Sequence, residues 1–200
     1  MNIRILGITG PSGAGKSLLS QSLSAKGIPV IDADEVYHSL LIPPSPCLDA
    51  LRDAFGDGIF GKDGSLDRAA LSAIVFHDKE KLNLLNKTVL RFVLERIDER
   101  IQALDAKGHT VVAVDGPTLI ESGYHKQCHT VVSVLAKEGI REERIRERDG
   151  LTEEQAKARI HAQPPEEFYR SHSHVIIENN RDEDALRIAV ESFLSTLPTP

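Results

Sequence analysis

The stretch from Gly10 to Ser17 limits what this chain can fold into more than any other. It reads G-x-x-x-x-G-K-S, after a short apolar run at residues 3–8 and before two leucines at helical spacing. A strand, a glycine-rich turn and a helix in this order form a phosphate-binding loop. Its glycines let backbone N–H groups approach a polyphosphate, and the helix N-terminus adds positive charge. We therefore predict that it binds a nucleoside triphosphate, with Lys16 on the β- and γ-phosphates and Ser17 on Mg²⁺.

The size and composition of the chain indicate one ordinary globular domain. With 200 residues, of which 40% are hydrophobic, it can bury a sizeable core and carry a small inserted subdomain. The net charge of −6 does not indicate a basic surface for nucleic acid. Cys47 and Cys128 match no metal or redox spacing, so we expect two reduced thiols and a cytoplasmic protein. We expect neither a membrane span nor a secretory signal, because no apolar run is long enough and the first residues lack a signal pattern.

Two carboxylates follow the second predicted strand, residues 28–31, in the sequence Asp32-Ala33-Asp34. If the strand continued, both side chains would share a face, which at the carboxyl edge of a parallel sheet opens on the ligand crevice. Alternatively, Asp34 is only the N-cap of a helix over residues 35–41. The stretch alone supports both interpretations equally, and the nearby phosphate loop favours catalysis or magnesium binding.

The middle of the chain predicts a helical insertion. Residues 42–46 contain three prolines and end a helix, and the segment to residue 78 is loop-rich with short helical pieces. One of these pieces ends at Val75 and is predicted to be capped by Asp67. From residue 79 to 106, apolar residues recur at steps of three and four, which predicts one long amphipathic helix. Long excursions of this kind between strands commonly carry substrate-binding elements.

Three further strands are predicted at residues 110–115, 130–135 and 175–177. The first ends in Asp115, the pattern of a Walker B segment, whose carboxylate holds Mg²⁺ through water. Together with the runs at residues 3–8 and 28–31, these three make five predicted strands. A closing helix is predicted over residues 182–195.

Arginines dominate the segment after the fourth predicted strand. Arg141, Arg144 and Arg148 lie at helical positions i, i+3 and i+7 and therefore share one face. Their acidic neighbours offer ordinary surface pairing, which contributes little to stability. In a phosphate-loop protein, such a face can instead form a lid that clamps the transferring phosphoryl group. A capping box at residues 152–155 starts the next helix, which two prolines at 164–165 end.

Several segments, taken in order, carry a resemblance to a known family. They are G-I-T-G-P-S-G-A-G-K-S at Gly7 to Ser17, I-D-A-D at Ile31 to Asp34, D-G-S-L-D-R at Asp63 to Arg68, D-G-P-T-L-I-E at Asp115 to Glu121, and R-I-R-E-R-D-G-L-T-E-E-Q-A-K-A-R-I-H-A-Q at Arg144 to Gln163. Over almost its whole length, the chain resembles dephospho-coenzyme A kinases. The phosphate loop occurs in many families, whereas the D-A-D, L-D-R and D-x-P-x-L-x-E elements in this order are much more specific.

The resemblance implies a fold, a reaction and its small-molecule partners. The fold is α/β: a three-layer P-loop NTPase fold with a doubly wound parallel five-stranded sheet, a helical substrate-binding insertion and a lid. The implied nucleotide core covers roughly residues 1–34, 107–136 and 174–200, the insertion 35–106 and the lid 137–170. Such an enzyme transfers the γ-phosphoryl group of ATP, with Mg²⁺, to the ribose 3′-hydroxyl of dephospho-CoA. We expect a monomer or small homo-oligomer that binds ATP and dephospho-CoA, with no nucleic acid and no membrane.

The resemblance also implies roles for individual residues. Asp34 would take the hydroxyl proton, with Lys16 and Arg144 assisting catalysis, and Asp32 would support Mg²⁺ or orientation. The implied ATP-binding residues are Ser12, Gly13, Ala14, Gly15, Lys16, Ser17, Arg148 and Asn179. The implied acceptor-binding residues are Asp32, Asp34, Asp67, Arg68, Asp115 and Pro117, and the implied Mg²⁺ ligands are Ser17, Asp32 and, through water, Asp115.

Departures from the family pattern keep a second hypothesis open. This chain has His38, Leu90-Arg91, Arg141 and Ser173-His174 where the family usually has other residues. They motivate a phosphate-loop kinase for another small hydroxyl or nucleotide acceptor. A third hypothesis, a GTP-dependent switch or nucleotide-binding regulatory module, predicts an N-K-x-D element, but Asn86-Lys87-Thr88-Val89 lacks the aspartate.

Overall fold

The computed structural model describes residues 2–76 and 78–197. The chain divides into two compact units, one made of Met1–Ile31 with Ala103–Pro200 and the other of Asp32–Gln102. We call them the core unit and the inserted unit. Within the described residues, no helix is both long enough and apolar enough to cross a membrane.

The core unit is built on the predicted sheet of five strands, in the order β2-β3-β1-β4-β5. The strands are β1 (Arg4–Thr9), β2 (Val30–Asp32), β3 (Val111–Asp115), β4 (Thr130–Leu135) and β5 (Val175–Glu178). β1 pairs in parallel with both β3 and β4, and β4 pairs in parallel with β5. Since parallel strands end at the same edge, the segments that follow β1, β3, β4 and β5 meet at one carboxyl edge.

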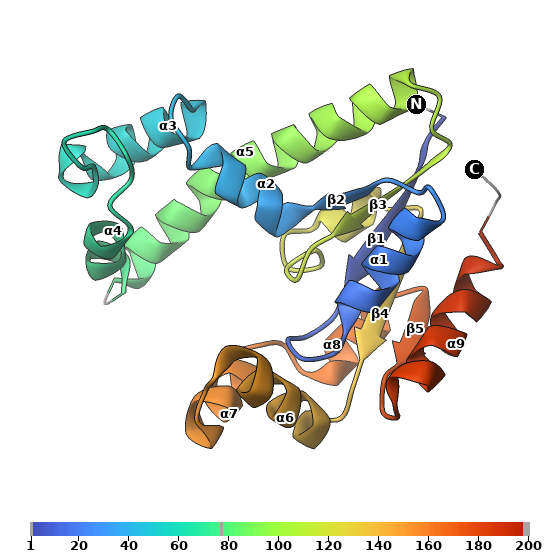
Figure 1. Ribbon diagram of the computed structural model, residues 1–200. Helices are drawn as coiled ribbons and strands as arrows, with labels where there is room; N and C mark the ends of the chain where they lie inside the picture. Colours follow the sequence, from blue (N-terminus) through green and yellow to red (C-terminus); the bar gives the residue numbers. More distant parts are fainter. Residues whose placement is uncertain (1, 77, 198–200) are drawn as a thin grey trace. The chain divides into compact units, whose positions relative to one another are not determined.

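Helices cover both faces of this sheet, which gives the three layers expected from the sequence. On one face, α1 (Lys16–Ala25) and α9 (Glu183–Leu194) pack with alternate strand residues such as Leu6, Val132 and Val134 (Figure 1). On the other face, α8 (Glu166–His172) buries Tyr169 against Ile120 and Leu135. Alternation along β4 therefore sends its side chains into two separate apolar clusters.

The remaining core-unit helices, α6 (Glu138–Asp149) and α7 (Glu153–His161), follow β4 and pack against each other (Figure 1). Ile145 from α6 meets Ala156 and Ile160 from α7 in a small apolar cluster. The predicted capping box starts α7. The Thr152 hydroxyl accepts from the backbone N–H of Gln155, and the side-chain oxygen of Gln155 accepts from the backbone N–H of Thr152. A short 3₁₀ helix, η2 (Tyr124–Gln127), precedes β4. α8 was not predicted, although Pro165 followed by two glutamates is a helix-start signal.

The inserted unit is helical, as predicted. It contains α2 (Ala33–Leu40), α3 (Pro46–Phe55), the 3₁₀ helix η1 (Asp57–Ile59), α4 (Arg68–Val75) and most of α5 (Lys79–Ala106). The predicted cap of α4 is confirmed, because one Asp67 oxygen accepts from the backbone N–H groups of Ala69 and Ala70. The predicted bounds of the long helix are also confirmed, and four apolar residues along it are buried: Val89, Val93, Ile97 and Ile101.

The local prediction around the carboxylate pair was wrong in two respects. The strand does not continue through Asp34 but ends at Asp32, and α2 begins at Ala33. The N-cap of α2 is Asp32, whose Oδ1 accepts from the backbone N–H groups of Asp34 (2.8 Å) and Glu35 (3.0 Å). The physical reason is that this side chain satisfies two of the unpaired N–H groups at a helix start, which competes with continued strand pairing.

Candidate active site

The phosphate loop after β1 is held by hydrogen bonds to its carbonyl groups. Every carbonyl from Gly10 to Ala14 accepts one, from Lys16 Nζ, Ala14 N–H, Arg141 Nε, Arg144 Nη1 and Asn179 Nδ2 in that order. In a trans peptide, the C=O and the following N–H point in opposite directions. Arg141 of α6 holds the Ser12 carbonyl, and Asn179 holds the Ala14 carbonyl. The N–H groups of the following residues, Gly13 and Gly15, therefore point away from Arg141 and Asn179, as an anion-binding loop requires.

The loop joins α1 at Gly15, which has a positive φ of 96°. A Cβ at this position would lie 2.3 Å from Asn179 Nδ2, so only glycine allows this approach. Lys16 and Ser17, predicted to bind phosphate and Mg²⁺, are the first two residues of α1. Lys16 Nζ donates to the Gly10 carbonyl over 2.8 Å.

Asn179 connects three elements around the loop. It follows β5, is 4% exposed, and donates from Nδ2 to the Ala14 carbonyl over 2.8 Å. Its backbone N–H donates to the Leu135 carbonyl of β4. Arg144 of α6 donates to both oxygens of Asn179, over 3.3 and 3.2 Å. The residue predicted to lie near the nucleotide therefore contacts both the loop and α6.

A hollow of about 320 Å³ opens beside Asn179 and the start of α1. Its volume is at the small end of the range of ligand pockets, about 300 to 1,000 Å³, and its walls combine apolar and polar groups. Such a lining suits a heteroaromatic base. Sequence reasoning included Gly15, Ser17, Arg144 and Asn179 but missed the remaining lining residues, which are Leu18, Gln21, Glu183 and Leu186.

Asp115 ends β3 at the same carboxyl edge and faces α1. Its Oδ2 accepts from the Ser20 hydroxyl over 2.6 Å, so the carboxylate lies beside the helix that carries Ser17. A hydroxyl and a carboxylate are hard oxygen donors of the kind that Mg²⁺ prefers, so these residues fit the ion. Pro117, two residues later, accepts from the Thr9 hydroxyl through its carbonyl.

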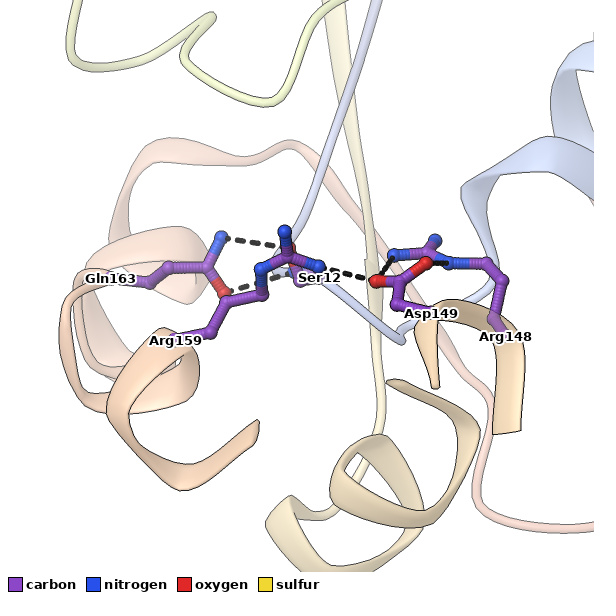
Figure 2. A network of polar contacts seen from close by, with 5 residues as sticks. All are labelled: Ser12, Arg148, Asp149, Arg159 and Gln163. Atoms are coloured by element: carbon purple, nitrogen blue, oxygen red, sulfur yellow. Dashed lines mark hydrogen bonds and ion pairs between the residues drawn. The ribbon is translucent and has the colours of Figure 1, made fainter. Parts of the chain in front are cut away.

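The three arginines predicted to share a helix face contact different groups. Arg141 and Arg144 both donate to the phosphate loop, whereas Arg148 donates to Asp149 through Nε (2.8 Å) and Nη2 (2.9 Å). Figure 2 shows Asp149 between Arg148 and Arg159 of α7, which also donates to it. These hydrogen bonds, chiefly those from Arg148, lower the pKa of Asp149 to about 2.

The predicted acceptor residues of the inserted unit lie at helix starts. Asp32 caps α2, Asp34 lies in its first turn, and Asp67 caps α4, whose first residue is Arg68. Sequence spacing predicted the cap at Asp67 but not the one at Asp32. Their roles toward a substrate stay predictions.

Comparison with protein families and curated proteins identifies relatives over nearly the whole chain. The family model described as dephospho-CoA kinase matches residues 4–184. The dephospho-CoA kinase of Arabidopsis thaliana is 37% identical over 198 residues, which cover 99% of this chain and 85% of that protein. That of Shouchella clausii is 37% identical over 175 residues, covering 88% of this chain and 89% of that protein.

Solved structures agree with this result. The protein TT1252 from Thermus thermophilus superposes with a TM-score of 0.82 and 32% identity, covering 98% of both chains. Dephospho-CoA kinase from Campylobacter jejuni has a TM-score of 0.71 and 26% identity, covering 96% of this chain and 95% of that one. Shikimate kinase from Acinetobacter baumannii has a TM-score of 0.56 and 18% identity, covering 96% of this chain and 92% of that one. This likeness shows only that the two proteins share the P-loop kinase fold. The chain belongs to the dephospho-CoA kinase family.

Proposed function

We propose that this protein transfers the γ-phosphoryl group of ATP to the ribose 3′-hydroxyl of dephospho-CoA, giving coenzyme A and ADP. The observation that carries the proposal is the family match over residues 4–184, which includes the whole phosphate loop. The hydrogen bonds to the carbonyls of that loop support ATP as the phosphoryl donor. Because these carbonyls are held from outside, the following N–H groups point into the loop, where they can bind a triphosphate.

The donor side is assigned to the core unit. The loop N–H groups and Lys16 hold the β- and γ-phosphates, and Arg144 adds positive charge as the phosphoryl group transfers. The hollow beside Asn179 accepts the base. Ser17 and, through water, Asp115 would hold Mg²⁺, which when bound supplies charge compensation at the phosphates.

The acceptor side is assigned by family resemblance. Asp34 takes the proton of the 3′-hydroxyl while that oxygen forms a bond to the γ-phosphorus. The bond between the γ-phosphorus and the bridging oxygen breaks, and ADP leaves with that oxygen. Asp32, Asp67, Arg68 and Pro117 bind or orient the acceptor, and Asp32 is an additional candidate for Mg²⁺.

An acceptor assay tests the proposed function. The purified protein is given Mg²⁺-ATP with dephospho-CoA or with a panel of nucleosides and nucleotides, and ADP release and the phosphorylated product are measured. We expect phosphorylation at the 3′-position of dephospho-CoA and much slower turnover of the panel. Rapid turnover of another acceptor with none of dephospho-CoA would overturn the proposal, and preferential binding of GTP over ATP would favour a regulatory module.

A further inference from the structure

The main chain of Ser12 is bonded to two side chains from the lid. Arg141 of α6 donates from Nε to the Ser12 carbonyl over 2.9 Å. The side-chain oxygen of Gln163, which follows α7, accepts from the Ser12 N–H over 3.0 Å (Figure 2). The same oxygen accepts from Nη2 of Arg141 over 3.0 Å. We call this closed set of hydrogen bonds among Ser12, Arg141 and Gln163 the Ser12 network.

The loop also packs closely on α6 at the next residue. Gly13 has a φ of +78°, and a Cβ there would lie 2.7 Å from the Arg141 carbonyl oxygen and 3.0 Å from its Cα. Backbone atoms of a helix cannot move aside as a flexible side chain can. The phosphate loop and α6 are therefore in direct main-chain contact next to the Ser12 network.

Arg141 is buried, with 8% of its surface exposed, although it carries a charge. Among the residues that the structure describes, no carboxylate lies within ion-pair distance of it, and its hydrogen-bond partners are neutral oxygens. Burial lowers the pKa of its guanidinium, an effect opposed by Tyr169, Glu138 and Glu166. Burying a charge without a counter-ion opposes folding, so stability alone does not explain an arginine here.

The guanidinium of Arg141 lies where it can orient the phosphate loop and place positive charge beside it. A guanidinium bonded to the Ser12 carbonyl leaves the peptide N–H of Gly13 pointing the opposite way, into the loop. It also fixes positive charge beside a loop that receives a polyphosphate. Gln163 completes the arrangement because it engages the N–H of Ser12 itself, which keeps this residue from rotating.

We propose that Arg141 and Gln163 are positioning residues that arrange the phosphate loop for the triphosphate before ATP binds, by holding Ser12 against the lid. Neither side chain needs to touch ATP. Without these two side chains, ATP binding must also order the loop, and the free-energy cost of that ordering weakens the affinity for ATP. The inference rests on the proposed function only in that the loop binds a triphosphate, whatever the acceptor is.

Binding of two probes tests the inference in the full chain. Arg141→Met and Gln163→Met each remove one member of the Ser12 network, and calorimetry gives the Kd for Mg²⁺-ATP and for inorganic tripolyphosphate. We expect each variant to bind both probes about tenfold more weakly, since charged or buried hydrogen bonds are lost. Hydrogen exchange of the peptide covering residues 10–17 should be faster in both variants without nucleotide. The matched control is Arg146→Met on the same helix, because Arg146 is 48% exposed and pairs with Glu142.

Two further measurements separate positioning from charge and from general damage. Arg141→Lys keeps the charge but loses the forked contact, so we expect affinities nearer to those of Arg141→Met than to wild type. In the kinase assay, KM for ATP should rise about tenfold with kcat changed by less than about twofold, because the loop is held alike in the ground and transition states.

Several results would overturn the inference. They are wild-type affinity and exchange in Gln163→Met, full rescue by Arg141→Lys, or an equal loss in Arg146→Met. If Arg141→Met fails to fold, Gln163→Met and Arg141→Lys still test the inference. Gln163 is only partly buried, so its replacement should not prevent folding, and lysine keeps the positive charge at position 141. Failure of the acceptor assay would leave these binding results unaffected, so the two proposals fail separately.

Discussion

Asp32 and Asp34 lie two residues apart in the chain but have different local roles in the structure. Asp32 uses one oxygen to cap α2, and Asp34 follows in the first turn of that helix. The main alternative to catalysis for Asp34 was that it caps α2. Asp32 occupies that N-cap position instead. An acidic residue in a first helical turn is favourable by only about 0.3 to 1 kcal/mol. Asp34 is therefore the better candidate for the base of the proposed reaction.

Replacing Asp34 with asparagine tests this role. General base catalysis contributes about 10²- to 10⁴-fold to rate, so we expect kcat of Asp34→Asn to fall by that factor. The Kd for ATP should change by less than about threefold, because the residue is assigned to the acceptor side. Glu35→Gln is the matched control, since Glu35 is the next residue of α2 and pairs with Arg100. Near-normal turnover of Asp34→Asn would show that another group takes the proton.

We predict that Asp115 is an outer ligand of Mg²⁺. Its carboxylate accepts from Ser20 at 2.6 Å, which orients it beside α1. Changing such an outer partner commonly lowers metal affinity about 10- to 100-fold, so we expect Asp115→Asn to need that much more Mg²⁺ for half-maximal rate. Ser20→Ala keeps the carboxylate and should shift the Mg²⁺ requirement less. An unchanged Mg²⁺ titration in Asp115→Asn would remove Asp115 from the metal site.

At the scale of elements, α6 and α7 form a small cluster of their own beside the phosphate loop. Ile145, Ala156 and Ile160 are buried between them. Asp149, the last residue of α6, accepts from its neighbour Arg148 and also from Arg159 of α7, and the second of these hydrogen bonds joins the two helices (Figure 2). Both segments contact the loop at Ser12, through Arg141 and Gln163. The segment predicted to be a lid, residues 137–170, is therefore bonded to the loop from α6 and from a residue that follows α7.

The pKa of Asp149 tests the hydrogen bonds that its carboxylate accepts, chiefly from Arg148 of the same helix and also from Arg159 of α7. Its folded-state value of about 2 lies below the unfolded value, so these hydrogen bonds stabilise the folded protein above the unfolded pKa. That contribution is lost as pH falls through the folded pKa, well below neutral pH. In carboxyl ¹³C NMR from pH 7 to pH 3, we expect the Asp149 signal to stay largely that of the ionised form, with Asp149→Asn identifying the signal. Half-titration near pH 4, about the ordinary aspartate value, would mean that these hydrogen bonds do not form in solution.

For the whole molecule, the sequence predicted most elements because they carry strong periodic signals. β4 and α5 have their predicted bounds, since a run of β-branched residues and a repeat along 28 residues leave little ambiguity. α8 has only 7 residues, too few for a repeat to show. The Ser12 network was also missed, because Ser12 lies 129 residues from Arg141 and 151 from Gln163. Spacing within one segment carries no information on contacts of that separation.

The division into two units has a consequence that thiol chemistry can measure. Cys47 lies in α3 of the inserted unit and Cys128 lies in the core unit, and both are buried. Burial raises the pKa of both thiols, that of Cys128 to about 12. Because the thiolate is the reactive form, each cysteine should be alkylated only when its own unit opens. The inserted unit is the smaller one. Smaller units generally bury a smaller share of their surface, so we expect Cys47 to react faster.

ATP should separate the two cysteines further, because the phosphate loop belongs to the core unit. At an ATP concentration of 100 Kd, ligand linkage lowers the population of the open form of the bound unit about 100-fold and slows alkylation of its cysteine by the same factor. We expect that slowing for Cys128 and a smaller one for Cys47, measured by pulsed alkylation and peptide mass spectrometry with and without Mg²⁺-ATP. Urea-unfolded protein, in which both thiols are exposed, gives the reference rates. Equal slowing of both cysteines would mean that the two units open together, since protection by ATP would then extend through the whole chain.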